Sequence, residues 1–436
     1  MNDPRPRTAK YVTLGCKLNF SETATMSKLL ASRGIVPAAG DETPDVCVVN
    51  TCSVTALADK KCRQQIRSLI HRYPAALMVV TGCYAQLKGT EVAAIPGVHI
   101  VLGSEYKNDI GDYVQRWFDD HDAQLVVSRH KDIKRFSPSC ECGDRTRYFL
   151  KVQDGCDYFC SYCTIPMARG RSRSGTIASL VEQARQVARQ GGKEIVITGV
   201  NIGDYGKNTG ERFLDLLQAL DRVDGIERYR ISSLEPDLLS DDIIAFCASS
   251  RAFMPHFHIP LQSGNDEVLA LMRRHYDRAL FAHKVERIHQ LFPHSFIGVD
   301  VMVGTRGETP ERFEDSRQFI ASLGVQHLHV FPYSERPGTQ ALSIPYIVDR
   351  ATKDERVATM IALSDAMQRQ FIERYVGTVR PVLMEQPHSG TVMHGFTDNY
   401  IRVNVPLRQE LVNTVVPVKL LTINADLSVD AQIATS

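Results

Sequence analysis

The stretch that decides the fold is Asp154-Gly155-Cys156-Asp157-Tyr158-Phe159-Cys160-Ser161-Tyr162-Cys163, which spaces three cysteines as C-x3-C-x2-C. Thiolates so close in sequence can hold one metal centre from a single loop. A structural zinc site normally takes four protein ligands, and a ferredoxin run usually supplies a fourth cysteine soon afterwards. Residues 164–170 contain no cysteine. Three thiolates on a four-iron cluster would leave one iron open for a small molecule, and we expect that arrangement here; the alternative is a zinc loop or thiols that are close by chance.

Length and composition indicate a soluble protein of about two or three domains. Of the 436 residues, 43% are hydrophobic and 23% are charged, as in globular proteins. The first seven residues lack an apolar secretion segment, and no run approaches the roughly 18 apolar residues of a membrane span. We therefore expect a cytoplasmic protein without a membrane partner, in which eleven cysteines indicate metal binding or catalysis rather than disulfides. The net charge of +1 means that any nucleic-acid affinity must come from a local basic face.

The first domain is expected to span residues 8–120 as an α/β, flavodoxin-like doubly wound fold. Short apolar runs alternate there with segments of helical periodicity, which favours a parallel sheet with crossover helices. The predicted strands are Lys10–Leu14, Asp45–Asn50, Leu77–Thr81 and Val98–Leu102.

Three cysteines of this domain, Cys16, Cys52 and Cys83, each follow a predicted strand. Loops at the carboxyl ends of adjacent parallel strands converge on one crevice, which is the usual ligand site of such sheets. The alternative is that these are ordinary small buried residues, as free cysteines often are. Three others fit that description: Cys47, Cys62 and Cys247. For the strand-end trio the placement predicts a second cluster site.

A polar linker is expected at residues 121–146. It contains the pair Cys140-Glu141-Cys142, which could be a ligand or redox pair but has no visible partner in the sequence. We interpret the pair as incidental.

The central domain is expected to span residues 147–372 as a partial (β/α)6 TIM barrel. Six strand patterns alternate with helical ones: Tyr148–Val152, Glu194–Thr198, Arg228–Ser232, His256–Pro260, Phe296–Val303 and Val325–Phe331. The three-cysteine loop then follows the first strand, on the face where barrel active sites are built.

Residues 373–436 form a further domain in which the pattern predicts short strands and no helices. The five predicted strands are Val379–Glu385, Gly390–His394, Tyr400–Val405, Leu411–Thr422 and Leu427–Ile433. This pattern predicts a small β-barrel of OB-like size. Such barrels commonly bind single-stranded or looped RNA, and the alternative is a role in packing alone.

With these pieces in place, the chain resembles the methylthiotransferase family of radical S-adenosylmethionine (SAM) enzymes over nearly its full length. The resemblance rests on five stretches besides the cysteine loop: Thr13–Asn19, Asn50–Thr55, Ala168–Ser174, Leu261–Asp266 and Phe331–Thr339. Within the family it looks most like the branch that modifies N6-threonylcarbamoyladenosine in tRNA. The segment Val303–Glu308 departs from the family pattern, with Thr305-Arg306 where Phe-Pro is usual; this affects expectations for nearby substrate contacts.

The resemblance implies a radical SAM barrel with a C-terminal TRAM domain and two [4Fe-4S] clusters. One cluster, held by Cys156, Cys160 and Cys163, would cleave SAM, and the other would be held by Cys16, Cys52 and Cys83. Four more residues are implied or suited to contact SAM: Tyr162, Gly199, Ser233 and Glu235. For the last three, a barrel turn or a helix cap is an equal alternative.

The implied reaction places a methylthio group on C2 of the adenine after a 5′-deoxyadenosyl radical removes its hydrogen. That chemistry needs no ionisable base, and the sequence shows no clear His/carboxylate constellation. His256 and His258 alternate on one predicted strand and are interpreted as barrel interior.

RNA contacts are expected from two groups of residues. Arg169, Arg171 and Arg173 could meet anticodon-loop phosphates, or could form a solvated face or barrel salt bridges. Phe396, Tyr400 and Arg402 of the terminal barrel could stack on or grip looped RNA.

The sequence therefore predicts a monomeric tRNA methylthiotransferase that acts on threonylcarbamoyladenosine just 3′ of the anticodon, supplied with electrons by a partner such as flavodoxin or ferredoxin. The same chemistry on isopentenyladenosine in tRNA, or on a ribosomal protein, is the nearest alternative. An iron–sulfur RNA-binding sensor without turnover and a zinc-holding RNA adaptor are alternatives of other classes.

Overall fold

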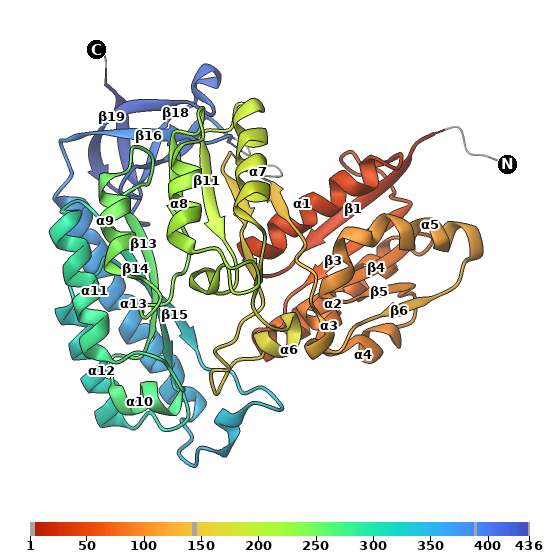
Figure 1. Ribbon diagram of the computed structural model, residues 1–436, viewed down its shortest axis with the longest axis horizontal. Helices are drawn as coiled ribbons and strands as arrows, with labels where there is room; N and C mark the ends of the chain where they lie inside the picture. Colours follow the sequence, from red (N-terminus) through yellow and green to blue (C-terminus); the bar gives the residue numbers. More distant parts are fainter. Residues whose placement is uncertain (1–4, 142–145, 388–389, 435–436) are drawn as a thin grey trace.

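The computed structural model describes residues 5–141, 146–387 and 390–434 and shows three parts (Figure 1). The N-terminal domain lies beside the central barrel, and the C-terminal barrel covers one end of it. No helix within the described residues is long and apolar enough to cross a membrane.

The N-terminal domain is a six-stranded parallel sheet in the order β2-β1-β3-β4-β5-β6. Its strands are β1 (Arg7–Thr13), β2 (Ile35–Pro37), β3 (Val46–Thr51), β4 (Leu77–Gly82), β5 (Ile100–Leu102) and β6 (Gln124–Val126). Its helices are α1 (Lys17–Ala31), α2 (Ala56–Arg72), α3 (Cys83–Leu87), α4 (Gly89–Ala93) and α5 (Ile110–Asp120), with a 3-10 turn η1 (Ser104–Asp109). Every residue of β3 and β4 is buried, because apolar clusters cover both faces of the sheet.

This strand order confirms the flavodoxin-like prediction. The order reverses at β1, which pairs with both β2 and β3, and ligands of such sheets bind at this switch point. Cys16 follows β1, Cys52 follows β3 and Cys83 follows β4. The three cysteines therefore lie on adjacent loops at one edge of the sheet.

The central domain is an open barrel of six parallel strands in two arcs, β8-β11-β12 and β13-β14-β15. The strands are β8 (Tyr148–Lys151), β11 (Glu194–Thr198), β12 (Arg228–Ile231), β13 (His256–Gln262), β14 (Phe296–Val303) and β15 (His327–Pro332). One parallel bridge, Tyr229 to Phe253, links the arcs. The helices are α6 (Ile165–Arg169), α7 (Ile177–Arg189), α8 (Phe213–Asp221), α9 (Asp241–Ser249), α10 (Asp266–Leu271), α11 (Arg278–Leu291), α12 (Pro310–Ser322) and α13 (Arg350–Glu373). The partial barrel is confirmed.

The described part of the expected linker contributes strands to both neighbouring sheets. β6 is the edge strand of the N-terminal sheet, and β7 (Ser139–Glu141) pairs antiparallel with β8. Between them lies a short 3-10 turn, η2 (His130–Asp132). Cys140 lies on β7 opposite Leu150, whereas Cys142 lies outside the described residues. The connection thus ties the two domains together through backbone pairing.

The C-terminal domain is the predicted small barrel, closed in the order β16-β17-β18-β20-β19. Its strands are β16 (Val379–Met384), β17 (Val392–Thr397), β18 (Arg402–Pro406), β19 (Val415–Ile423) and β20 (Val429–Ile433). It docks on the N-terminal ends of the central strands, where Arg228 and Arg230 of β12 donate to backbone carbonyls of Phe396, Thr397 and Asp398.

Candidate active site

The loop that carries Cys156, Cys160 and Cys163 is closed by backbone contacts at its two ends. β9 (Gln153–Asp154) pairs antiparallel with β10 (Arg173–Ser174), and the Cys156 amide donates to the Gly170 carbonyl at 3.1 Å. Gly155 has a φ of +71°, and a Cβ there would lie 2.0 Å from the Arg171 carbonyl oxygen. Only glycine fits this turn, so the sequence DGC begins the loop.

Each of the three sulfurs accepts hydrogen bonds. The amides of Tyr158 and Ile165 donate to the sulfurs of Cys156 at 3.5 Å and Cys163 at 3.4 Å. The Arg274 guanidinium donates to the Cys160 sulfur at 3.0 Å. Donors of this kind stabilise cluster thiolates and tune their potential.

The thiols of this loop lie close to one another, with Cys160 buried and Cys156 and Cys163 half-buried. Burial, and then the neighbouring Cys160, raises the pKa of both Cys156 and Cys163 to about 12. A metal centre must therefore displace these protons as it binds. No three His, Cys, Asp or Glu side chains of the described chain converge as a site for a single metal ion.

Two residues expected to contact SAM, Gly199 and Ser233, line a cavity at the carboxyl ends of the barrel strands. Glu235 lies beside the cysteine loop, where Arg274 donates to its carboxylate. Burial raises the pKa of Glu235 to about 7, against the lowering effect of Arg274. Tyr162 is half-buried and accepts from the same guanidinium at 3.5 Å. Roles of these four residues in SAM binding stay predictions.

Sequence reasoning missed Arg274, the residue that connects this group. Its guanidinium joins the Cys160 sulfur to the Glu235 carboxylate and lies 5.0 Å from the centre of the Tyr276 ring. The residue sits in a polar segment after α10, where a lone arginine carries no recognisable signal.

Three cysteines of the N-terminal domain, Cys16, Cys52 and Cys83, also lie near one another. Gly15, with a φ of +112°, lies so close to the next loop that a Cβ would be 2.7 Å from Cys52 Cβ. Burial, and then the nearby Cys83 and Cys16 thiols, raises the pKa of Cys52 to about 12. Cys62 donates to the Cys52 carbonyl at 3.3 Å. Cys16 and Cys83 therefore both lie near Cys52, and a cluster shared by the three cysteines stays a prediction.

A cavity of about 580 Å³ lies between Cys16 of the N-terminal domain and the barrel residues Gly199 and Ser233, which are expected to contact SAM. The N-terminal domain contributes Gly15, Cys16 and Lys17 to its wall, and the barrel contributes Gly199 and Ser233 among others. A molecule held in this cavity would touch the expected SAM side and the second cysteine group at once.

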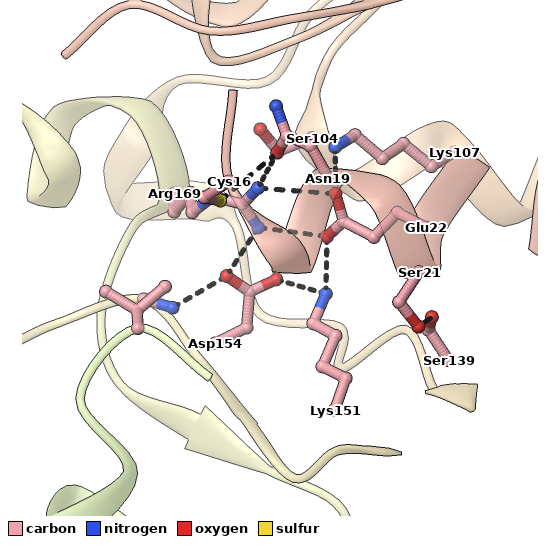
Figure 2. A network of polar contacts seen from close by, with 12 residues as sticks. Cys16, Asn19, Ser21, Glu22, Ser104, Lys107, Ser139, Lys151, Asp154 and Arg169 are labelled. Atoms are coloured by element: carbon pink, nitrogen blue, oxygen red, sulfur yellow. Dashed lines mark hydrogen bonds and ion pairs between the residues drawn. The ribbon is translucent and has the colours of Figure 1, made fainter. Parts of the chain in front are cut away.

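A buried ionic network joins the two domains (Figure 2). Glu22 of α1 accepts from Lys151 at 2.8 Å and from Arg169 at 2.9 Å, and it also pairs with Lys107. Asp154, two residues before Cys156, accepts from Lys151 at 2.6 Å and Arg169 at 3.1 Å. All five side chains are at most 5% exposed. Because a buried charge left unpaired is costly, these contacts fix α1 against the cysteine loop.

The network also reaches the N-terminal cysteines. Arg169 donates to Asn19 Oδ1 at 2.7 Å, and the Asn19 amide donates to the carbonyl of Thr51, next to Cys52, at 3.0 Å. The network's cations are Lys107, Lys151, Arg169 and Arg173, and its carboxylates are Glu22 and Asp154. The cations exceed the carboxylates, so an anionic cluster at the neighbouring thiolates would be electrostatically favoured.

The expectation that Arg169 and Arg173 contact RNA is wrong. Their side chains are 2% and 4% exposed. Arg173 donates to Asp154 at 3.1 Å and to the Arg169 carbonyl at 2.6 Å. The salt-bridge alternative therefore holds for both, whereas Arg171 is exposed and remains available to a phosphate.

Phe396 and Tyr400 dock the terminal barrel on the central one instead of facing outward. Their rings stack at 4.8 Å, and Tyr400 lies 4.1 Å from the His256 ring. Arg147 covers the Phe396 ring at 4.6 Å. The expected exposed stacking platform is therefore corrected, while Arg402 is exposed.

Tyr400→Ala is expected to lower the stability of the protein more than its affinity for RNA. Tyr400 keeps a φ of +67°, which is costly for an aromatic residue, because docking holds it there. Losing the half-buried ring should cost about 2–3 kcal/mol, below the value for a fully buried aromatic. Denaturant unfolding measures this, and Arg402→Ala is the exposed control. A variant with unchanged stability and weakened RNA binding would restore the stacking role.

Comparisons with known proteins agree with this architecture. Residues 150–320 match the Radical SAM superfamily, and residues 8–103 match the Uncharacterized protein family UPF0004. The solved structure of the radical S-adenosylmethionine methyltransferase TsrM from Kitasatospora setae is similar to this one, with a TM-score of 0.58. The match covers 77% of each chain at 14% sequence identity. That similarity concerns the fold.

Relatives that match this chain over nearly its full length identify the family more specifically. A Bacillus subtilis (strain 168) protein named threonylcarbamoyladenosine tRNA methylthiotransferase MtaB is 38% identical, covering 95% of this chain and 94% of the relative. An Aquifex aeolicus (strain VF5) protein of the same name is 33% identical, covering 90% and 95%. A tRNA-2-methylthio-N(6)-dimethylallyladenosine synthase from Syntrophotalea carbinolica is 32% identical, covering 94% and 95%.

The open barrel with its three-cysteine loop is the catalytic domain of a radical SAM enzyme. Taken over its full length, the chain belongs to the methylthiotransferase family of those enzymes, with the relatives named MtaB among its members. Membership implies SAM and a [4Fe-4S] cluster as cofactors. The hydrogen-bonded thiols of Cys156, Cys160 and Cys163 fit that cluster.

Proposed function

We propose that this enzyme converts N6-threonylcarbamoyladenosine at position 37 of tRNA, next to the anticodon, to its 2-methylthio form, using two [4Fe-4S] clusters and two molecules of SAM. The observation that carries the proposal is the cavity whose wall holds Cys16 on one side and the expected SAM contacts Gly199 and Ser233 on the other. A target base in it would have the SAM-cleaving site on one side and the sulfur-bearing site on the other.

The bound clusters and SAM would supply hydrogen removal at adenine C2 and the methylthio group that replaces the hydrogen. Cys156, Cys160 and Cys163 would hold the first cluster, and Cys16, Cys52 and Cys83 the second. The chain's remaining task is to position the base.

Several residues would perform that positioning. Arg274 would orient Glu235 toward SAM while donating to the Cys160 sulfur. Gly199 and Ser233 would contact SAM on the cavity wall. The Glu22 network would keep the two cluster loops at a fixed separation, because none of its buried charges can be left unpaired at low cost.

Arg171 and Arg402 are the exposed cations that would meet phosphates of the anticodon stem-loop. Such contacts would weaken as salt rises. A small electron-transfer protein such as flavodoxin or ferredoxin would reduce the SAM-cleaving cluster, and we propose that the protein works as a monomer.

The relatives include enzymes named for dimethylallyladenosine, so isopentenyladenosine is the alternative substrate. The cavity argues against it. Lys17 and His329 line its wall beside the bonded pair His258–Asp300, and an apolar substituent would offer Lys17 and His329 no polar partner. A substituent with a carboxylate and a hydroxyl would supply one.

The deciding experiment compares substrates on the reconstituted enzyme under reducing conditions. Transcripts carrying threonylcarbamoyladenosine, isopentenyladenosine or unmodified adenosine are incubated with SAM, and the nucleosides are analysed by mass spectrometry. We expect a methylthio product from the first RNA only. A product from isopentenyladenosine alone would overturn the substrate assignment, and SAM cleavage without any product would favour a different acceptor such as a ribosomal protein.

A further inference from the structure

A second chamber of about 200 Å³ opens toward the terminal barrel. Lys17, His258 and His329 line both this chamber and the active-site cavity, so the two spaces meet at these three side chains. We call it the histidine chamber, because the barrel contributes His256, His258, His327 and His329 to its wall.

The histidines form an inward-facing layer on alternating positions of β13 and β15. His258 and His329 stack with ring centres 4.8 Å apart, and His258 Nε2 bonds to Asp300 at 2.8 Å. Burial, and then His258, lowers the pKa of His329 to about 4. At neutral pH the His329 ring is therefore an uncharged hydrogen-bonding group, and the positive charge of this region comes from elsewhere.

Lys17 is the source of that charge. Its side chain is exposed to the cavities, and it forms no ion pair or hydrogen bond with the described residues. It begins α1, whose N-cap Cys16 makes no side-chain cap bond and whose first turn has no acidic residue. The positive end of the helix dipole thus adds to the ammonium charge.

The other charged groups of the two chambers are already paired. Asp300 bonds to His258, and Arg402 lies 3.9 Å from Asp426 at the outer end of the histidine chamber. An anionic ligand that reaches the junction would therefore meet Lys17 as its counter-ion. The junction also adjoins Cys16, so a substituent on a base held near the second cysteine group would extend into it.

We propose that Lys17 is the specificity-determining residue that pairs with the carboxylate of the threonylcarbamoyl substituent, while the imidazoles of His258 and His329 hydrogen-bond its remaining polar atoms. The proposal rests on the proposed function for the identity of the substituent. It assigns the preference for an anionic adenosine substituent to one side chain adjacent to a cluster ligand.

The test measures equilibrium binding of two anticodon stem-loop RNAs, one with threonylcarbamoyladenosine and one with its neutral methyl ester. The unaltered holoenzyme should bind the acid about 10- to 100-fold more tightly, as expected for a charge-assisted contact. Lys17→Met should bind both RNAs equally, and Lys17→Arg should restore part of the preference. Lys61→Met, an exposed lysine on α2, is the surface-charge control. Iron content checks that the change beside Cys16 leaves the cluster intact.

Equal binding of acid and ester by the unaltered enzyme would overturn the proposal without any variant. So would a preference that survives in Lys17→Met, or one that disappears in Arg402→Met instead. Because binding is measured without turnover, its outcome is separate from the proposed function. An enzyme that prefers the acid through Lys17 but forms no methylthio product would refute the proposed function and support the assignment of Lys17.

Discussion

Alanine replacement of Cys16, Cys52 and Cys83 together is expected to abolish methylthio transfer while SAM cleavage continues. These thiols lie on three adjacent loops of the N-terminal sheet, and burial together with Cys83 and Cys16 raises the pKa of Cys52. The SAM-cleaving loop belongs to another domain and keeps its own hydrogen bonds to sulfur. After anaerobic reconstitution, iron should fall from about eight to about four per chain, 5′-deoxyadenosine should still form, and no methylthio nucleoside should appear.

Two control variants make that result specific. Cys156→Ala/Cys160→Ala/Cys163→Ala should lose the complementary half of the iron and all SAM cleavage. Cys47→Ala removes a fully buried thiol of β3 in the same domain, and it should keep all of its iron. Unchanged iron after loss of Cys16, Cys52 and Cys83 would mean that they hold no cluster, and the proposed sulfur insertion would then fail.

The positions of these six cysteines could be predicted because they depend on local patterns. Each N-terminal cysteine directly follows a short apolar run, and the alternation of strands and helices brings such loops to one edge of a sheet. The cysteine loop likewise follows the first strand of the barrel. The same periodicity predicted the open barrel and the small terminal barrel, since burial of alternate faces leaves a signal in the sequence.

Arg169, Phe396 and Tyr400 were misassigned because the residues they contact lie far away in the sequence. Arg169 pairs with Glu22, and the Tyr400 ring lies against His256. Nothing in a local pattern distinguishes a charge that faces solvent from one that faces a carboxylate of another domain. The sequence did carry a weak signal of this buried polar contact. Asn19 and Glu22 are polar residues three apart on the side of α1 that also buries Met26.

Glu22→Gln is expected to produce the largest loss of stability of any single substitution in the ionic network. The change leaves Lys107, Lys151 and Arg169 buried without their shared carboxylate. Breaking a buried ion pair on one side costs about 3–5 kcal/mol. Thermal and denaturant unfolding should show this loss. Methylthio transfer should fall more than SAM cleavage, because only methylthio transfer needs the two cysteine loops at a fixed separation.

The pH dependence of that loss identifies its cause. Burial alone would raise the pKa of Glu22, but Arg169, Lys107 and Lys151 outweigh it and hold the pKa well below its ordinary value of 4.5. A carboxylate whose pKa is lowered by folding stabilises the protein above the unfolded-state pKa, and loses that contribution as pH falls through the folded-state pKa. The stability difference between the unaltered protein and Glu22→Gln should therefore be constant from neutral pH to about 4.5 and shrink only below it.

The matched control is Glu91→Gln, which breaks an exposed pair with Lys88 on the surface of the same domain. Surface pairs contribute about 0–1 kcal/mol, so this variant should unfold almost as the unaltered protein does.

If Glu22→Gln and Glu91→Gln lost equal stability, the network would contribute no more to stability than a surface pair. The two cysteine loops would then have to be held by the backbone pairing of β7 with β8 and by packing alone. Protease cleavage between the first two domains would distinguish these cases, because only a network that holds the domains together makes Glu22→Gln more susceptible than Glu91→Gln.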